Sequence, residues 1–365
     1  TVWGDESVRY FVVDGALHAV DLDGRGRFGA LAAEACRVES VERLGEPDVP
    51  IGFRQDDNGL HLDTPRSALD RRGHRGDIAN VAVHRITYAA AERPVELFEP
   101  TQRQPVELAP LMRGVSSGDI VQLGDGTYLG PVTVPAGVIV RGLGAGRTSI
   151  DGRGSTAVTL ERGARLEHLA VGGGPERMAW FPAATVEVRG PTATVIGCRV
   201  DGHVVVRADD VLVRATTAAG VVAETADRVS VSRCQLSGMR WDVGVHLIGG
   251  GGHEVDSCEI RDHLCAIRAV ETTGTVIRGN NIRARWWGVH LVQTEEAHVH
   301  GNFVDHTLRG VDIDGGSRAI VDGNAVCDGD SGCIVEWGAS DCEVSGNRWE
   351  RCRIGILAWE ATALH

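Results

Sequence analysis

A pattern of apolar and polar positions recurs about every 22 residues in the second half of the chain. Alignment of the repeats puts one small or polar residue of each at an equivalent position: Cys198, Thr216, Cys234, Cys258, Asn280, Asn302, Asn324 and Asn347. The spacings along this ladder are 18, 18, 24, 22, 22, 22 and 23 residues. A regular period of this length predicts a solenoid of stacked coils. We expect the ladder residues to bend the chain between two strands, and the asparagines to hydrogen-bond from coil to coil.

A further strand begins eight residues after each of the last four ladder positions. Two of these segments are Gly288-Val289-His290-Leu291-Val292 and Gly310-Val311-Asp312-Ile313-Asp314. Side chains alternate between the two faces of a strand, so the aliphatic residues at the second and fourth positions should fill the core. The residues between them should point outward. The pattern predicts a right-handed parallel β-helix of about ten coils over residues 118–365.

The first 95 residues have a different pattern, which is typical of antiparallel hairpins. Two apolar runs flank Asp14-Gly15, and two more flank Asn58-Gly59; both dipeptides favour hairpin turns. An alternating segment at 78–88 would supply a closing strand. The predicted chain is therefore all-β, with a small antiparallel β-sandwich at 1–95, a linker or cap at 96–117 and the β-helix at 118–365. Residues 106–112 are a helix candidate in the cap, which would cover the apolar end of the first coil.

Both parts carry motifs of known families. The segment 118–128 (GDIVQLGDGTY) and the following strand at 138–144 resemble the start of pectate-lyase-like β-helix proteins. The hairpin at 8–22, followed by the strands at 52–63, resembles the C-terminal β-domain of α-L-fucosidases. In that family the catalytic nucleophile and acid/base lie on a (β/α)8 barrel, which this chain lacks. The resemblance therefore carries over no catalytic residue.

Composition narrows the possible partners. The net charge is -13 and every basic residue is arginine, which argues against a nucleic-acid partner. No apolar run approaches the roughly 20 residues of a membrane span. Nine cysteines cannot all pair within the chain, and none has zinc-site spacing, so no metal is predicted. A bridge between Cys327 and Cys352 stays open. An extracellular location is favoured, and the oligomeric state is open.

The outward positions of the second strands form two rows. The first row is predicted to contain His246, Arg268, His290, Asp312, Ile334 and Leu357. The second row is predicted to contain Ile248, Val270, Val292, Asp314, Glu336 and Trp359. Coils lie about 4.8 Å apart, so adjacent members of a row can touch. Turns beside the rows add polar and aromatic side chains: Trp241, Asp262, His263, Trp286, Trp287, His306, Arg309, Asp328 and Asp330.

These side chains predict a site that processes a glycan. Paired carboxylates serve as acid and base in glycosidic cleavage, and crowding raises the pKa of one of them. Tryptophan rings pack against the apolar faces of sugars, and arginine can neutralise an acidic sugar. The candidate catalytic residues are Asp312, Asp314, Glu336 and His290. The candidate substrate-binding residues are His246, Arg268, Trp286, Arg309, Trp359 and Asp330.

Several alternatives remain open. The polar row could be a solvated ladder of compatible charges, since an outward row is polar in any case. The leading function is a glycoside hydrolase or another polysaccharide-processing enzyme, such as a lyase, that acts on a poly- or oligosaccharide. The others are a non-catalytic glycan-binding or accessory part of a larger α-L-fucosidase-type enzyme, and a structural solenoid. No cofactor is expected, although the string Asp328-Gly329-Asp330 leaves calcium open. Trp287 shares a register position with Cys265 and Ile354, which indicates partial burial.

Overall fold

A computed structural model describes residues 2–4, 8–13, 16–21, 27–28, 36–43, 51–56, 59–63, 82–90, 105–175, 183–238 and 242–365. The chain divides into two compact units, Thr1–Pro94 and Val95–His365, and each is described by itself. Trp241 and the turn residues Asp14, Gly15 and Asn58 lie outside the described residues.

The first unit contains the two predicted hairpins. A five-stranded antiparallel sheet has the order β1 (Val2–Gly4), β2 (Val8–Val13), β3 (Ala16–Asp21), β8 (Ala82–Ala90) and β5 (Cys36–Arg43). A second sheet has the order β4 (Arg27–Phe28), β7 (Gly59–Asp63) and β6 (Gly52–Asp56). Ala19 and Ile86 of the first sheet pack in one buried cluster with Leu60 and Leu62 of the second. The two sheets therefore form a sandwich. Its closing strand is β8, and residues 78–81 of the expected strand lie outside the described residues.

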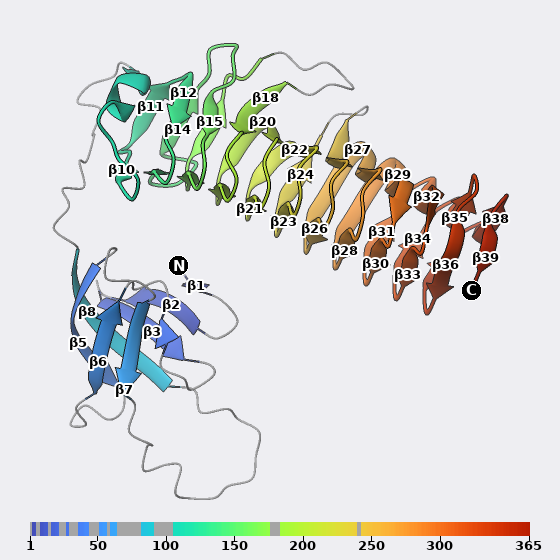
Figure 1. Ribbon diagram of the computed structural model, residues 1–365, viewed down its shortest axis with the longest axis horizontal. Coiled ribbons are helices and arrows are strands. Elements are labelled where there is room, and N and C mark those ends of the chain that lie inside the picture. The colour runs from blue at the N-terminus through green and yellow to red at the C-terminus, as the bar shows by residue number, and fades with distance from the viewer. Residues whose placement is uncertain are drawn as a thin grey trace, which may run out of the picture. The chain divides into compact units, whose positions relative to one another are not determined.

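The second unit is a parallel β-solenoid of about 11 turns (Figure 1). Each coil contributes strands to three columns in turn, and every strand pairs in parallel with the equivalent strand of the next coil. The first column consists of β10 (Ile120–Gln122), β13 (Ile139–Arg141), β16 (Arg165–Glu167), β19 (Thr194–Ile196), β21 (Leu212–Arg214), β23 (Ser230–Ser232), β26 (Glu254–Asp256), β28 (Val276–Arg278), β30 (His298–His300), β33 (Ile320–Asp322) and β36 (Ser340–Ser345).

Four long strands bend from the second column into the third. They are β20 (Arg199–Val206), β22 (Thr217–Glu224), β27 (Glu259–Val270) and β29 (Asn281–Glu295). The second column also contains β9 (Val106–Glu107), β11 (Gly126–Leu129), β14 (Thr148–Asp151), β17 (Ala170–Gly172), β24 (Gln235–Ser237), β31 (Phe303–Asp305), β34 (Ala325–Cys327) and β37 (Arg348–Glu350). The third contains β12 (Val132–Val134), β15 (Val158–Leu160), β18 (Ala184–Val188), β25 (Val243–Ile248), β32 (Arg309–Ser317), β35 (Ser331–Glu336) and β38 (Ile354–Trp359). The last strand, β39 (Thr362–Leu364), pairs with β36.

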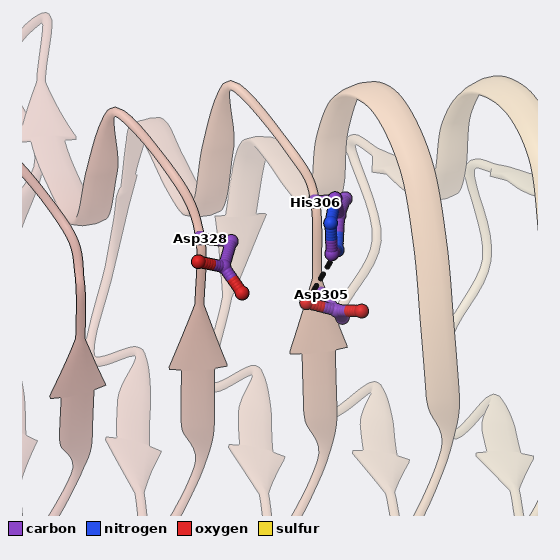
Figure 2. A group of neighbouring side chains, drawn as sticks. All are labelled: Asp305, His306 and Asp328. Atoms are coloured by element: carbon purple, nitrogen blue, oxygen red, sulfur yellow. Dashed lines mark ion pairs between the residues drawn. The ribbon is translucent and has the colours of Figure 1, made fainter.

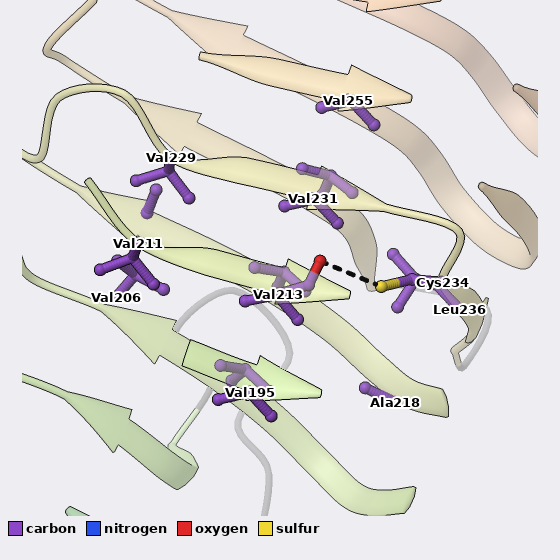
Figure 3. Packing of buried hydrophobic residues seen from close by; sticks show 14 of the residues in the cluster. Val195, Val206, Val211, Val213, Ala218, Val229, Val231, Cys234, Leu236 and Val255 are labelled. Atoms are coloured by element: carbon purple, nitrogen blue, oxygen red, sulfur yellow. Dashed lines mark hydrogen bonds between the residues drawn. The ribbon is translucent and has the colours of Figure 1, made fainter. Parts of the chain in front are cut away.

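Inward side chains stack in register to form the core. Val195, Val213, Val231 and Val255 pair from coil to coil in the first column and are all fully buried (Figure 3). In the third column Val289, Leu291, Val311 and Ile313 are also fully buried, as the alternation predicted. Each coil is narrow, so these aliphatic stacks supply most of the apolar burial that stabilises the unit.

The predicted ladder lies at the turn between the first and second columns. The Nδ2 atoms of Asn280, Asn302 and Asn324 each donate to Oδ1 of the next asparagine at 2.9 Å, so Asn347 ends the stack. The left-handed residue is the one before each asparagine, not the asparagine itself. These preceding residues have φ of 62 or 63°: Gly279, Gly301, Gly323 and Gly346. Glycine therefore makes the bend. The asparagine side chains form hydrogen bonds with buried backbone N–H and carbonyl groups of the adjacent coils.

One local expectation was wrong, and one open alternative is resolved. The helix candidate at 106–112 is strand β9, which pairs with β11, followed by one 3-10 turn at Ala109–Met112. The Cys327–Cys352 bridge is not formed: the Sγ of Cys327 lies 3.6 Å from a carboxylate oxygen of Glu350, and that of Cys352 donates to the Val326 carbonyl oxygen at 3.5 Å. Among the described residues, no helix has the length and hydropathy that a membrane span needs.

Candidate functional site

The strand register assembles both predicted rows on the outer face of the third column. In the first row, Arg268 pairs with His246 on one side and His290 on the other, and His290 pairs with Asp312. In the second row, Asp314 pairs with Glu336, which pairs with Trp359. The sequence pattern thus gave the correct neighbours, and we call this surface the third-column face.

The exposure of Asp312 differs from the expectation. Its position on the outer face predicted contact with solvent, but the residue is 0% exposed. The Oδ2 atom accepts hydrogen bonds from Trp287 Nε1 at 2.9 Å and from Arg309 Nη1 at 2.6 Å. The same Arg309 nitrogen donates to Glu336 Oε1 at 3.0 Å. We call these four residues the Asp312 network.

One oxygen of this buried carboxylate is left without a partner. Among the described residues no donor reaches Asp312 Oδ1. A buried acceptor that makes no hydrogen bond costs stability. Asp312 therefore fixes Arg309 and Trp287 in place, and it is poorly placed to touch a substrate itself.

The bend of β29 into the third column explains why Trp287 and Arg309 cover Asp312. Trp287 lies at this bend and pairs in register with Arg309, the first residue of β32. The glycines that follow them let the coils approach closely: a Cβ at Gly310 would lie 2.4 Å from the Gly332 carbonyl oxygen. The Trp287 ring stacks on the His290 ring, with centroids 4.9 Å apart and planes 6° apart. The sequence indicated that Trp287 is partly buried, but no sequence signal identified its bond to Asp312.

Asp314 is the most accessible carboxyl group of the site, and the buried His290 lies next to it. His290 Nε2 lies 3.8 Å from Asp314 Oδ2, and the Asp314 side chain is 33% exposed. Burial, with a further contribution from Arg268, lowers the pKa of His290 to about 4, although Asp314 opposes the shift. Burial also raises the pKa of Asp314; the Asp312 and Glu336 carboxylates add to the rise and His290 opposes it. Near neutral pH the imidazole is therefore neutral, beside a carboxyl group whose pKa lies above its ordinary value.

The two coils before His290 add His246 and Arg268, and the Arg268 cation lies in register between the two histidines. Burial and the charge of Arg268 lower the pKa of His246 to about 4. His246 Nε2 is buried and has no hydrogen-bond partner among the described residues. Arg268 forms no ion pair within the described part of the chain. This end of the face thus carries a positive charge that no described carboxylate neutralises.

Tryptophans border the site at both ends. Trp286 is 42% exposed and its ring lies 5.3 Å from that of Trp287. Trp359 and Trp337 are both 55% exposed, with ring centroids 5.5 Å apart and planes at 45°. Trp337 was not among the predicted site residues, although it directly follows Glu336 in the sequence. The third-column face therefore offers exposed aromatic rings on either side of its carboxylates.

Asp330 does not join the Asp312 network. It accepts hydrogen bonds from Arg353 at 2.6 and 3.0 Å, and this contact lowers its pKa. Arg351 binds Asp328 in the same way, at 2.5 and 2.6 Å. Arginines of the next coil therefore neutralise both carboxylates of the string that suggested calcium.

Asp328 also belongs to a second group of possible metal ligands. Figure 2 shows it near Asp305 and His306 at the ends of β31 and β34. His306 Nδ1 lies 2.7 Å from Asp305 Oδ1, and one potential ligand atom of each residue lies within 4.8 Å of the others. The guanidinium group of Arg351 on Asp328 opposes a cation here.

Comparisons with known proteins define the class of fold. Residues 219–364 match the family model described as "Right handed beta helix region", so the solenoid is a right-handed β-helix. No curated protein matches the sequence.

Similar solved structures include DFA-IIIase from Arthrobacter chlorophenolicus A6 in complex with GF2. It is 11% identical, with a TM-score of 0.53 over 69% of this chain and 87% of that chain. The same enzyme without its lid is 11% identical, with a TM-score of 0.52 over 67% and 83%. The surface adhesin PfbA of Streptococcus pneumoniae is 8% identical, with a TM-score of 0.49 over 72% and 98%. At these identities the likeness shows the fold alone.

Proposed function

We propose that this protein binds a glycan along the third-column face and cleaves a glycosidic bond there. The observation that carries the proposal is the buried Asp312, which Arg309 and Trp287 hold in place, beside the more accessible Asp314. A fixed polar layer under a solvent-accessible acid is the arrangement that a catalytic group needs to keep its orientation. The fold itself does not support this function over another, because β-helices host unrelated functions.

Asp314 is the proposed general acid. Its raised pKa favours the protonated form, which can donate a proton to the glycosidic oxygen as the bond to the anomeric carbon breaks. In a hydrolase, water then bonds to the anomeric carbon, and a carboxylate accepts the proton of the water. Glu336, one coil further on and held by Arg309, is the proposed base. Trp286 and Trp359 would stack on sugar rings at either end, and Arg268 would hold a polar or acidic group.

One observation favours elimination as a second chemistry. His290 is neutral at neutral pH and can accept a proton, as the base of a lyase must. A lyase product carries a carbon–carbon double bond, whereas a hydrolase product does not. The ultraviolet absorbance of the products therefore separates the two reactions.

The test is to replace Asp314 by Asn and measure turnover of glycans that the wild-type protein binds. We expect turnover to fall by about 10²–10⁴-fold, the usual contribution of a general acid, while the melting temperature stays close to that of the wild type. Asp341→Asn is the matched control, because Asp341 is an exposed strand carboxylate that lies in β36, away from this face. Wild-type turnover by the Asp314→Asn variant would remove Asp314 from the mechanism.

A second candidate function is an accessory, glycan-binding role. It rests on the resemblance of residues 1–95 to the β-domain of α-L-fucosidases, which stays a prediction. Because the part of the chain that the structure describes contains no (β/α)8 barrel, we expect this protein not to hydrolyse an aryl α-L-fucoside. Release of the aryl group that Asp314→Asn abolishes would instead place fucosidase chemistry on the β-helix.

A further inference from the structure

A pocket of about 390 Å³ opens at the corner between the second and third columns. It is separate from the Asp312 network, although Arg285 in its wall immediately precedes Trp286. This volume is within the range of small-ligand pockets. Four successive coils supply its lining: Gly238; Asp262 and His263 of β27; Arg283, Ala284 and Arg285 of β29; and His306.

Two arginines of this pocket have no carboxylate partner. Arg283 and Arg285 are exposed, and neither forms an ion pair with any described residue. Along the strands, Arg283 pairs in register with Arg261 on one side and Asp305 on the other. Arg261 instead contacts a glutamate of its own strand, and the Asp305 carboxylate lies beside His306. Two cations thus line one pocket, and a third cation lies in register beside Arg283.

This charge arrangement is uncommon in such an acidic chain. The protein has 50 acidic and 37 basic residues, and most arginines on neighbouring turns are paired, as Arg351 is with Asp328. Like charges in adjacent strand positions repel each other. An anion in the pocket would relieve this repulsion and form charge-assisted hydrogen bonds to both guanidinium groups.

The other walls suit a ligand that also carries hydroxyl groups. His263 is fully buried, and its Nε2 lies 2.8 Å from the Ala219 carbonyl oxygen, so that nitrogen donates the hydrogen bond and the ring is rigidly held. Burial lowers the pKa of His263, so it adds no positive charge at neutral pH. Asp262 can accept hydrogen bonds from hydroxyl groups. A simple anion uses only the arginines, whereas an acidic sugar uses the whole lining.

We propose that this pocket binds the carboxylate or sulfate group of an acidic sugar, which makes the substrate an acidic glycan. The inference rests on the proposed function in one respect: the sugar in the pocket belongs to the glycan that lies on the third-column face. Trp286, next to Arg285, would stack on a sugar between the two places.

The experiment measures binding of the full chain to an array of neutral, carboxylated and sulfated oligosaccharides. We expect the bound glycans to be acidic and their affinity to fall as salt is added. Arg283→Ala and Arg285→Ala should each weaken binding about tenfold or more, the usual effect of losing a charge-assisted hydrogen bond. Arg162→Ala is the matched control, because Arg162 is also exposed and has no ion pair within the described residues.

The outcomes separate this inference from the proposed function. Asp314→Asn should bind acidic glycans like the wild type; if it also turns them over normally, the catalytic assignment fails and the pocket stands. Binding of neutral glycans alone, or of none, would overturn the pocket assignment. Unchanged glycan binding by both pocket variants would also overturn it, as would binding of inorganic phosphate to a protein that binds no glycan.

Discussion

The burial of Asp312 and the accessibility of Asp314 lead to opposite predictions for the same chemical change. In each case Asn replaces Asp and removes one negative charge with little change in volume. Asp312 loses its charge where Arg309 donates at 2.6 Å inside the structure. Hydrogen bonds to charged groups contribute about 1.5–3 kcal/mol, so we expect Asp312→Asn to lower the free energy of unfolding by that amount.

Asp314→Asn should behave differently, because the folded protein already disfavours the charged form of this side chain. Its raised pKa means that ionisation at pH 7 costs some stability, and the neutral amide avoids this cost. We expect its free energy of unfolding to stay within about 0.5 kcal/mol of the wild type or to rise. Its turnover should fall, as described above.

Urea unfolding at pH 7, with glycan turnover measured on the same samples, tests the pair. Asp312→Asn is expected to lose stability, whereas Asp314→Asn is expected to lose turnover while its stability is unchanged. If Asp312→Asn unfolds within about 0.5 kcal/mol of the wild type, Arg309 and Trp287 do not depend on this carboxylate. The distinction between a positioning and a reacting carboxyl group would then be wrong.

Two further predictions concern the histidines of the first row. His290 has a folded pKa of about 4 against an ordinary 6.5, so between these values the unfolded chain binds a proton that the folded protein does not. The contribution of His290 to stability is therefore fully present above pH 6.5 and is lost as the pH drops toward 4, by up to ~3 kcal/mol. In urea titrations, the free energy of unfolding of His290→Asn should depend less on acid pH than that of the wild type. The same acid dependence in both proteins would refute the lowered pKa of His290. His246 pairs in register with Val222, and its buried Nε2 has no partner among the described residues, so His246→Val should raise the free energy of unfolding by about 1 kcal/mol. A clear loss of stability in that variant would mean that the imidazole has a structural role.

The register of the β-helix could be predicted because two periodicities agree. The 22-residue spacing aligns the coils, and the alternation within each strand decides which side chains enter the core. Val289 and Asp312 were therefore assigned to the correct faces. The same logic gave the asparagine stack, and of the two residue types that tolerate a left-handed bend it is the glycine before each asparagine that adopts it.

The burial of the outer face could not be predicted in the same way. Whether an outward residue meets solvent depends on which turn side chain folds over it. Trp287 lies 25 residues before Asp312 in the sequence, and no periodicity links the two. The corner pocket is lined by residues of four coils, so it too forms only when the coils are stacked. Trp337 is the exception, because its place after Glu336 is plain in the sequence.

A comparison along the first row shows that the fold does not require polar residues there. Coils before and after the cluster have Val205, Val222 and Ile334 at the same register position, and all three are buried. An aliphatic residue therefore satisfies this position, and the buried Asp312 with its unpaired oxygen stabilises the solenoid less than such a residue would. The polar run begins at His246 and ends at Asp312, on the coils that also carry the two unpaired arginines of the corner pocket. The polar row therefore costs stability on the same coils that carry unneutralised arginines. For this reason we assign the polar row to a site and not to the architecture of the β-helix.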